Sequence, residues 1–255
     1  MDETIKLNNL DDYRAAAKKY QGQPELFLKD KEFFKFQSSE YQSVQTHSSC
    51  IDLILGIPVA EIEKELRERA KKLWPGGTIE SWSQDLYEGA MTWVGLNPAQ
   101  LQTPYAEIYD LFKVIDLKKR SLVVDLGAGY GRLGVVLGLL CPECEFLGFE
   151  MAQERVEAGN ALYSRLELPK TKLIQKNIAA DEFELPAADV FFIYDFGSLP
   201  DMKKLLAKLD ELADKREAFS VIARGRGINA LIQETAPWLT VKAKEAGNSV
   251  IYTYV

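Results

Sequence analysis

The stretch VVDLGAGYGRLG, residues 123–134, constrains the fold more than any other part of this 255-residue chain. An apolar run ends in a glycine-rich turn, and an apolar helical pattern follows it directly. Glycines at a strand-to-helix junction allow positive φ and let a ligand approach the backbone closely. The N–H groups at the start of the following helix attract an anion. The segment therefore predicts a strand, a cofactor-binding loop and a helix in succession.

These glycines fit two different patterns. Gly129, Gly131 and Gly134 match the G-x-G-x-x-G pattern of dinucleotide-binding domains. Asp125, Gly127, Gly129 and Gly131 match acid-x-G-x-G-x-G instead. The dinucleotide pattern starts directly at the strand end, which leaves Gly127 unexplained, and a carboxylate at the mouth of the loop would repel a pyrophosphate. We therefore favour the second pattern and expect Gly134 to pack inside the helix.

Strand and helix patterns alternate after residue 120. The expected strands are 122–125, 146–149, 172–175, 190–194 and 219–223. Such alternation predicts a parallel sheet with helices on both sides. Two further strand patterns, 238–244 and 249–254, are joined by a turn-like segment with no room for a helix, so they should pair antiparallel. The predicted fold class is α/β, a Rossmann-like, mostly parallel seven-stranded sheet with an antiparallel C-terminal hairpin.

The first 98 residues carry helical patterns and little strand pattern. Apolar residues at helical spacing predict an amphipathic helix over 59–73, and 11–20 and 25–36 are weaker helical candidates. Thr103 and Pro104 predict the cap and first residue of a helix that runs to about residue 115. We therefore divide the chain into a helical N-terminal region, 1–98, which we expect to cover the substrate entrance, and a cofactor-binding domain, 99–255.

Residues 121–255 resemble the class I S-adenosylmethionine-dependent methyltransferases. In that family the first motif reads acid-x-G-x-G-x-G after the first strand, the second strand ends in an acid, and the last two strands form a reversed hairpin. This sequence has VVDLGAGYG, then LGFE ending at Glu150, then the closing hairpin. The resemblance covers slightly over half of the chain. It implies S-adenosylmethionine as cofactor and methyl transfer as the reaction.

The resemblance also implies which residues contact the cofactor. The loop backbone would lie against the methionine and ribose portions, with Asp125 close to their positive charge, and Glu150 would accept hydrogen bonds from the ribose hydroxyls. Asn177 and Ile178 would meet the adenine, at a position where the family often has an acid. The helix before the first strand often caps the cofactor in lysine methyltransferases of this fold. The candidate cofactor-binding residues are thus Asp125, Gly127, Ala128, Gly129, Gly131, Glu150, Asn177, Ile178, Tyr105 and Glu107.

Asp195 follows the fourth strand pattern, in the segment IYDFGS. In this fold the loop after the fourth strand borders the methyl donor and the acceptor, so Asp195 is the candidate catalytic residue. A helix cap or a turn is an equally good interpretation of this aspartate. The segment lacks the N/D-P-P-Y/F pattern of amide and exocyclic amine methylation, and it lacks the cysteine of cytosine C5 methylation.

The methyl acceptor stays open between a protein side chain, such as lysine, and a small molecule. A net charge of −7 and a pI near 5.0 argue against a nucleic-acid partner. An NAD-dependent oxidoreductase is the alternative enzyme, because an acid 21 residues after Gly129 also suits an NAD ribose. A non-catalytic S-adenosylmethionine-binding protein is a third possibility. The oligomeric state is left open.

The cysteine and histidine content argues against a metal site. Cys141 and Cys144 have C-x-x-C spacing, but His47 is the sole histidine and no second ligand pair is present. We expect His47 at the surface. An odd number of cysteines, with no signal peptide or membrane-spanning run in the sequence, favours a reducing, cytoplasmic setting.

Overall fold

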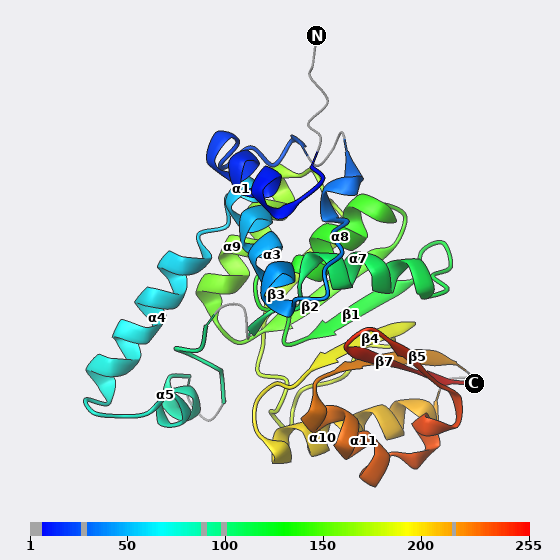
Figure 1. Cartoon of the computed structure of the whole chain (residues 1–255). Helices are drawn as coiled ribbons and strands as arrows, with labels where there is room; N and C mark the ends of the chain where they lie inside the picture. The colour runs from blue at the N-terminus through cyan, green and yellow to red at the C-terminus, as the bar shows by residue number, and fades with distance from the viewer. Residues whose placement is uncertain (1–6, 27–29, 88–90, 98–100, 216–217) are drawn as a thin grey trace.

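A computed structural model describes residues 7–26, 30–87, 91–97, 101–215 and 218–255. Its centre is a seven-stranded sheet with the strand order β3-β2-β1-β4-β5-β7-β6 (Figure 1). The pairs from β3 to β5 are parallel, whereas β7 runs antiparallel to both β5 and β6. The strands are β1 (Leu122–Leu126), β2 (Glu145–Glu150), β3 (Thr171–Gln175), β4 (Val190–Tyr194), β5 (Phe219–Arg224), β6 (Ala243–Ala246) and β7 (Ser249–Tyr254). The predicted fold class is confirmed.

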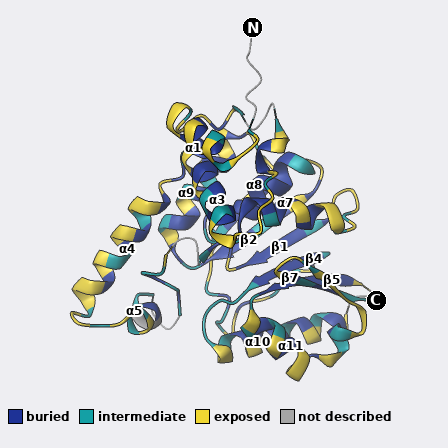
Figure 2. Cartoon of the chain, viewed as in Figure 1, coloured by how far each residue is buried: buried dark blue, intermediate teal, exposed yellow. Residues whose placement is uncertain are grey.

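Helices cover both faces of the sheet, which explains why the central strands β1 and β4 are buried along nearly their whole length and are apolar except for Asp125 and Tyr194. One face carries α7 (Tyr105–Val114), α8 (Arg132–Leu140) and α9 (Gln153–Arg165). The opposite face carries α10 (Leu199–Ala213), α11 (Arg226–Thr235) and the 3₁₀ helix η2 (Pro237–Lys242). Each face has its own hydrophobic core, and the central strands between the two cores are buried (Figure 2).

The N-terminal helices extend the core on the α8 side. They are α1 (Leu10–Lys19), the 3₁₀ helix η1 (Lys31–Phe34), α3 (Tyr41–Leu55), α4 (Val59–Leu73) and α5 (Ile79–Asp85). Tyr13 of α1, Ile51 of α3 and Val136 of α8 are buried in one hydrophobic cluster. By contrast, α4 and α5 project to one side of the molecule, with their outer faces exposed (Figures 1 and 2). None of the described helices combines the length and apolarity needed to cross a bilayer.

Several local predictions require correction. The helix expected over 25–36 is reduced, in its described part, mainly to the short η1, and α3 was not predicted at all. The strand expected over 238–244 begins only at Ala243, because Pro237 opens the 3₁₀ helix η2. Pro104 occupies the cap position of α7 and no side chain caps that helix, so Thr103 does not have the predicted role. The amphipathic helix over 59–73 is confirmed as α4.

His47 is buried, contrary to the surface position that we predicted. Its ring lies between Tyr13 and Phe36, with ring centroids 4.4 and 4.8 Å away. The ring nitrogen Nε2 is 3.2 Å from the carbonyl oxygen of Phe33. Burial lowers the pKa of His47 to about 4, so this histidine is a neutral core residue at physiological pH.

Gly134 packs inside α8, as predicted. A Cβ atom at this position would lie 2.2 Å from the Tyr163 hydroxyl and 2.7 Å from Phe146 Cδ1. The glycine therefore allows α8 to pack closely against α9 and β2.

Replacing Gly134 with alanine should lower the free energy of unfolding by about 1–3 kcal/mol, because the clash exceeds the gain of up to about 1 kcal/mol in helix propensity. Gly138→Ala is the matched control in the same helix, since its Cβ would meet side chains only at 3.1 Å. Urea denaturation of both variants measures the difference. Equal stability of the two variants would contradict this account of the packing.

Candidate active site

A cavity of about 270 Å³ lies at the carboxyl ends of β1, β2 and β4. Its lining includes Gly127 and Gly129 of the loop, Glu150 at the end of β2, and Asn177 and Ile178 after β3. Open α/β sheets bind ligands at this edge, at the point where the strand order reverses, which here lies between β1 and β4. The fold thus brings together in one cavity five of the predicted cofactor-binding residues.

The glycine loop leaves room for a ligand at its centre. Gly129 has a φ of +54°, and the nearest atom to a Cβ built there is Cγ of Gln102, 4.0 Å away. Its N–H donates a 2.9 Å hydrogen bond to Oε2 of Glu150. The N–H groups of Gly127 and Ala128 both donate to the carbonyl oxygen of Phe149. These three hydrogen bonds therefore hold the loop to the end of β2, and Gly127 and Gly129 of the loop line the cavity.

Two buried acidic residues, Asp125 in β1 and Glu150 at the end of β2, lie next to this loop in the sequence or in space. Glu150 is only 6% exposed, and its Oε1 accepts a 2.9 Å hydrogen bond from the N–H of Ala152. Burial, and secondly the nearby charge of Glu150, raise the pKa of Asp125 to about 8. Glu150 lines the cavity, whereas Asp125, which we predicted to contact the cofactor, is buried outside the lining. Of these two acids, only Glu150 is therefore placed to accept hydrogen bonds from hydroxyl groups of a ligand in the cavity.

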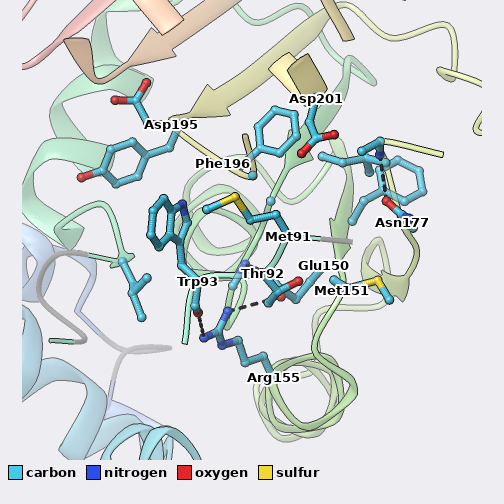
Figure 3. A pocket seen from close by; sticks show the side chains of 18 of the residues that line it. Met91, Thr92, Trp93, Glu150, Met151, Arg155, Asn177, Asp195, Phe196 and Asp201 are labelled. Carbon is cyan, nitrogen blue, oxygen red and sulfur yellow. Dashed lines mark hydrogen bonds and ion pairs between the residues drawn. The ribbon is translucent and has the colours of Figure 1, made fainter. Parts of the chain in front are cut away.

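Arg155 of α9 connects Glu150 to the N-terminal helices. Its guanidinium donates to both carboxylate oxygens of Glu63 in α4, at 2.9 and 3.1 Å, and lies 3.4 Å from Glu150 (Figure 3). It also donates to the carbonyl oxygen of Trp93 at 2.8 Å. Burial opposes the charge, but the two carboxylates outweigh it and raise the pKa of Arg155. The hydroxyl of Tyr130, in the loop, also donates to Glu63.

A second buried ion pair fixes the start of α8. Arg132 directly follows the glycine loop and is paired with Asp52 of α3. The hydroxyl of Tyr105 donates to the same carboxylate at 3.0 Å, and the Tyr105 ring lies under the Arg132 guanidinium. Burial works against the charge of Arg132, and Asp52 more than restores it, so the pKa of Arg132 is raised. Both ends of the loop–helix junction are thus held by carboxylates from the N-terminal region.

Tyr105 and Glu107 do not lie where the sequence analysis placed them. Tyr105 is fully buried beneath Arg132 and is absent from the cavity lining. Glu107 is turned toward β5 and β7, where it pairs with Arg224 at 3.0 Å and accepts from Asn248. The physical reason is that α7 begins with its first turn packed against α3, which directs both side chains away from the cofactor loop.

Asp195 is positioned as a helix cap. Its carboxylate accepts hydrogen bonds from the N–H groups of Gly227 and Ile228, at 3.2 and 2.7 Å, in the first turn of α11. Figure 3 shows the carboxylate directed away from Glu150 and Arg155. Asp195 still contributes to the cavity lining. The geometry therefore agrees with the cap interpretation, and direct contact with an acceptor stays a prediction.

Of the remaining predicted residues, Asn177 and Ile178 line the cavity and Gly131 and Ala128 do not. Asn177 Oδ1 accepts a 3.0 Å hydrogen bond from the N–H of Ala179, which holds the turn after β3. Ile178 is buried against the α10 side of the sheet. Gly131 is the cap residue of α8, with a φ of +76°, and does not line the cavity. Ala128 is likewise outside the lining.

The sequence analysis missed four residues that belong to this site. Arg155 and Glu63 were hidden in the polar faces of amphipathic helices, where nothing in the spacing distinguishes a buried ion pair from solvent-exposed charges. Trp93 and Gln102 lie in segments with no regular secondary structure beside residues 98–100, which are outside the described residues. The aromatic residues between positions 82 and 93 were the feature of the sequence that could have indicated that Trp93 lines the cavity.

The direction of β7 decides between the two fold families considered. A dinucleotide-binding domain has the strand order 3-2-1-4-5-6, with all strands parallel. Here an antiparallel β7 is inserted between β5 and β6, and an acid ends β2 beside the glycine loop. This is the class I methyltransferase fold.

Part of this chain is similar to known methyltransferases. No family model matches the sequence. The ribosomal RNA small subunit methyltransferase G of Syntrophomonas wolfei is 36% identical over 81 residues, 32% of this chain and 37% of that protein. The matched part thus spans well under half of that relative.

Solved methyltransferase structures are similar at low sequence identity. An RNA methyltransferase from Salinibacter ruber, in complex with S-adenosyl-L-homocysteine, has a TM-score of 0.45 and 16% identity over 60% of this chain and 92% of that one. A SAM-dependent methyltransferase from Aquifex aeolicus has a TM-score of 0.46 and 16% identity over 63% of this chain and 100% of that one.

Replacing Glu63 with glutamine should lower the free energy of unfolding by about 3 kcal/mol, because a buried guanidinium then loses one of its two carboxylates. Glu154→Gln is the matched control, since Glu154 pairs with Arg69 across the same two helices but in a more exposed position, with side chains 28% and 44% exposed. That control should cost less than about 1 kcal/mol. Chemical denaturation measures the free energy of unfolding of both variants. Similar decreases in the two would show that the buried ion pair stabilises the fold no more than the more exposed pair.

Proposed function

We propose that this protein is an S-adenosylmethionine-dependent methyltransferase. The observation that carries the proposal is the meeting of the glycine loop with Glu150, the acid that ends β2, in the cavity at the carboxyl edge of the sheet. S-adenosylmethionine carries a cationic sulfonium, an ammonium and a ribose diol. The carboxylate of Glu150 lines the cavity and would accept hydrogen bonds from the diol.

The residues present fit each part of this cofactor. The open surface over Gly129 would accommodate the methionine portion, and Glu150 would accept hydrogen bonds from the ribose hydroxyls. Asn177 lies to one side of Glu150 (Figure 3), and with Ile178, which also lines the cavity, it would hold the adenine. When bound, this cofactor supplies an electrophilic methyl group on sulfur. An acceptor lone pair would displace the sulfur of this methyl group, so that S-adenosylhomocysteine would remain in the cavity and an amine acceptor would lose one proton to solvent.

The acceptor side of the cavity is aromatic and apolar. Met91, Trp93, Leu96, Leu101, Tyr194 and Phe196 line it. Figure 3 shows Trp93 and Phe196 on this side, with Met91 between them. Aromatic faces attract ammonium groups and also enclose a neutral amine in a dry site. We therefore propose an amine acceptor, on a protein side chain such as lysine or on a small molecule.

RNA is the second candidate acceptor, because the relative from Syntrophomonas wolfei is named as a ribosomal RNA methyltransferase. Binding of RNA normally depends on basic side chains that contact phosphates. Among the described residues that line the cavity, only Arg155 and Lys176 are basic, and Arg155 is buried in ion pairs. The charge distribution therefore favours the amine.

Thermal unfolding in the presence of S-adenosylhomocysteine and of NAD tests the cofactor assignment. S-adenosylhomocysteine at about 100 times its dissociation constant should add roughly 2.7 kcal/mol to the free energy of unfolding, because it binds only the folded chain. Glu150→Ala should weaken its binding about tenfold or more, through lost hydrogen bonds to a charged group. Stabilisation by NAD alone would overturn the proposal.

Transfer of a labelled methyl group from S-adenosylmethionine into fractionated cell extract tests the acceptor. We expect label in the protease-sensitive or small-molecule fraction, whereas label that is released only by ribonuclease would establish RNA instead. Trp93→Ala should raise the KM for the acceptor while leaving affinity for S-adenosylhomocysteine within about threefold, because only the acceptor wall changes. Tight cofactor binding with no transfer to any fraction would support a non-catalytic binding protein.

A further inference from the structure

Gln102 is a buried amide with unmet hydrogen-bonding capacity in the cavity wall. It is 6% exposed and lines the cavity just before α7 begins. Neither Oε1 nor Nε2 of its side chain has a hydrogen-bond partner among the described residues. Buried polar atoms of native proteins are nearly always paired, and the exceptions often mark functional positions. The side chain is therefore suited to a partner that enters the cavity.

The position of Gln102 selects one end of the cavity. Its Cγ is the nearest atom, at 4.0 Å, to a Cβ built on Gly129, so the side chain lies beside the centre of the glycine loop. Gln102 lines the same cavity as Glu150 and Asn177, the residues assigned to the ribose and the adenine. The ligand atoms nearest to Gln102 are thus those that lie on the loop itself.

The backbone that directly follows Gln102 is held by two hydrogen bonds. The carbonyl oxygen of Thr103 accepts a 3.2 Å hydrogen bond from Arg132. The N–H of Tyr105 donates to the Ser48 hydroxyl at 3.0 Å. A side chain on such a fixed segment loses little freedom on binding a ligand.

The chemistry of an amide matches an α-amino acid group. The carbonyl of glutamine accepts from an ammonium, and its NH₂ donates to a carboxylate. We propose that Gln102 binds the ammonium and carboxylate of the cofactor's methionine end, and so sets the direction in which the methyl group points. This inference rests on the proposed function, because it assumes that the cavity holds S-adenosylmethionine.

Two ligands that differ only at this end provide the test. S-adenosylhomocysteine carries the amino acid group, whereas 5′-methylthioadenosine has a methyl group in its place. Calorimetric titration of Gln102→Leu should show a loss of about 10- to 100-fold for S-adenosylhomocysteine, since hydrogen bonds to two charged groups disappear. Affinity for 5′-methylthioadenosine should change by less than about threefold.

The stability of the ligand-free variants separates a binding role from a structural one. Leucine has nearly the volume of glutamine and removes two unpaired polar atoms, so Gln102→Leu should have an unchanged or higher Tm without ligand. Gln153→Ala, an amide deleted from the exposed start of α9, is the control and should leave both affinities unchanged. Gln102→Glu should show a smaller loss than Gln102→Leu, because it keeps an acceptor for the ammonium.

Each contrary result has a definite meaning. Equal losses for both ligands, or no loss for either, would overturn the assignment of Gln102 to the amino acid end. A fall in Tm of the ligand-free Gln102→Leu protein that accounts for the weaker binding would overturn it as well. Failure of the unmodified chain to bind either ligand would instead overturn the proposed function, and the inference with it.

Discussion

The guanidinium of Arg155 is the contact on which the site depends. It is buried between Glu63 of α4 and Glu150 of β2, and it also holds the Trp93 carbonyl oxygen. A charge in such a position is costly unless it is fully paired. Glu150 in turn holds the N–H of Gly129. One cation therefore fixes together Glu150, the glycine loop, the segment of Trp93 and α4.

This arrangement changes how the N-terminal region is understood. A cover over the substrate entrance could be a separate layer, but here α3 and α4 each place a buried carboxylate next to the loop–helix junction. Their apolar residues also share the hydrophobic cluster of α8. Breaking either ion pair would leave a buried charge without its partner, which costs several kcal/mol. The N-terminal helices are thus structural supports of the cavity, and any role in acceptor access is added to that.

The sequence predicts those features that follow from local pattern. The strands, the reversed hairpin, α4 and the glycine loop all follow from residue periodicity or from glycine at fixed spacing. Features that depend on which element packs where could not be predicted in this way: His47 and α3 are buried only because α1 covers them. Tyr105 was misplaced for the same reason, because its hydroxyl finds Asp52, 53 positions earlier in the chain. Contacts between residues so far apart in the chain cannot be predicted from local sequence patterns.

Asp195 illustrates how a helix cap can shape the wall of the cavity. Its carboxylate caps α11, and a Cβ at Gly225 would lie 2.3 Å from it, which explains the glycines in the segment RGRG. Tyr194 and Phe196, its neighbours in sequence, both line the acceptor side of the cavity. In-line displacement at a methyl group depends mainly on orientation. By fixing the backbone between these two aromatic rings, the cap would hold the wall against which an acceptor is aligned.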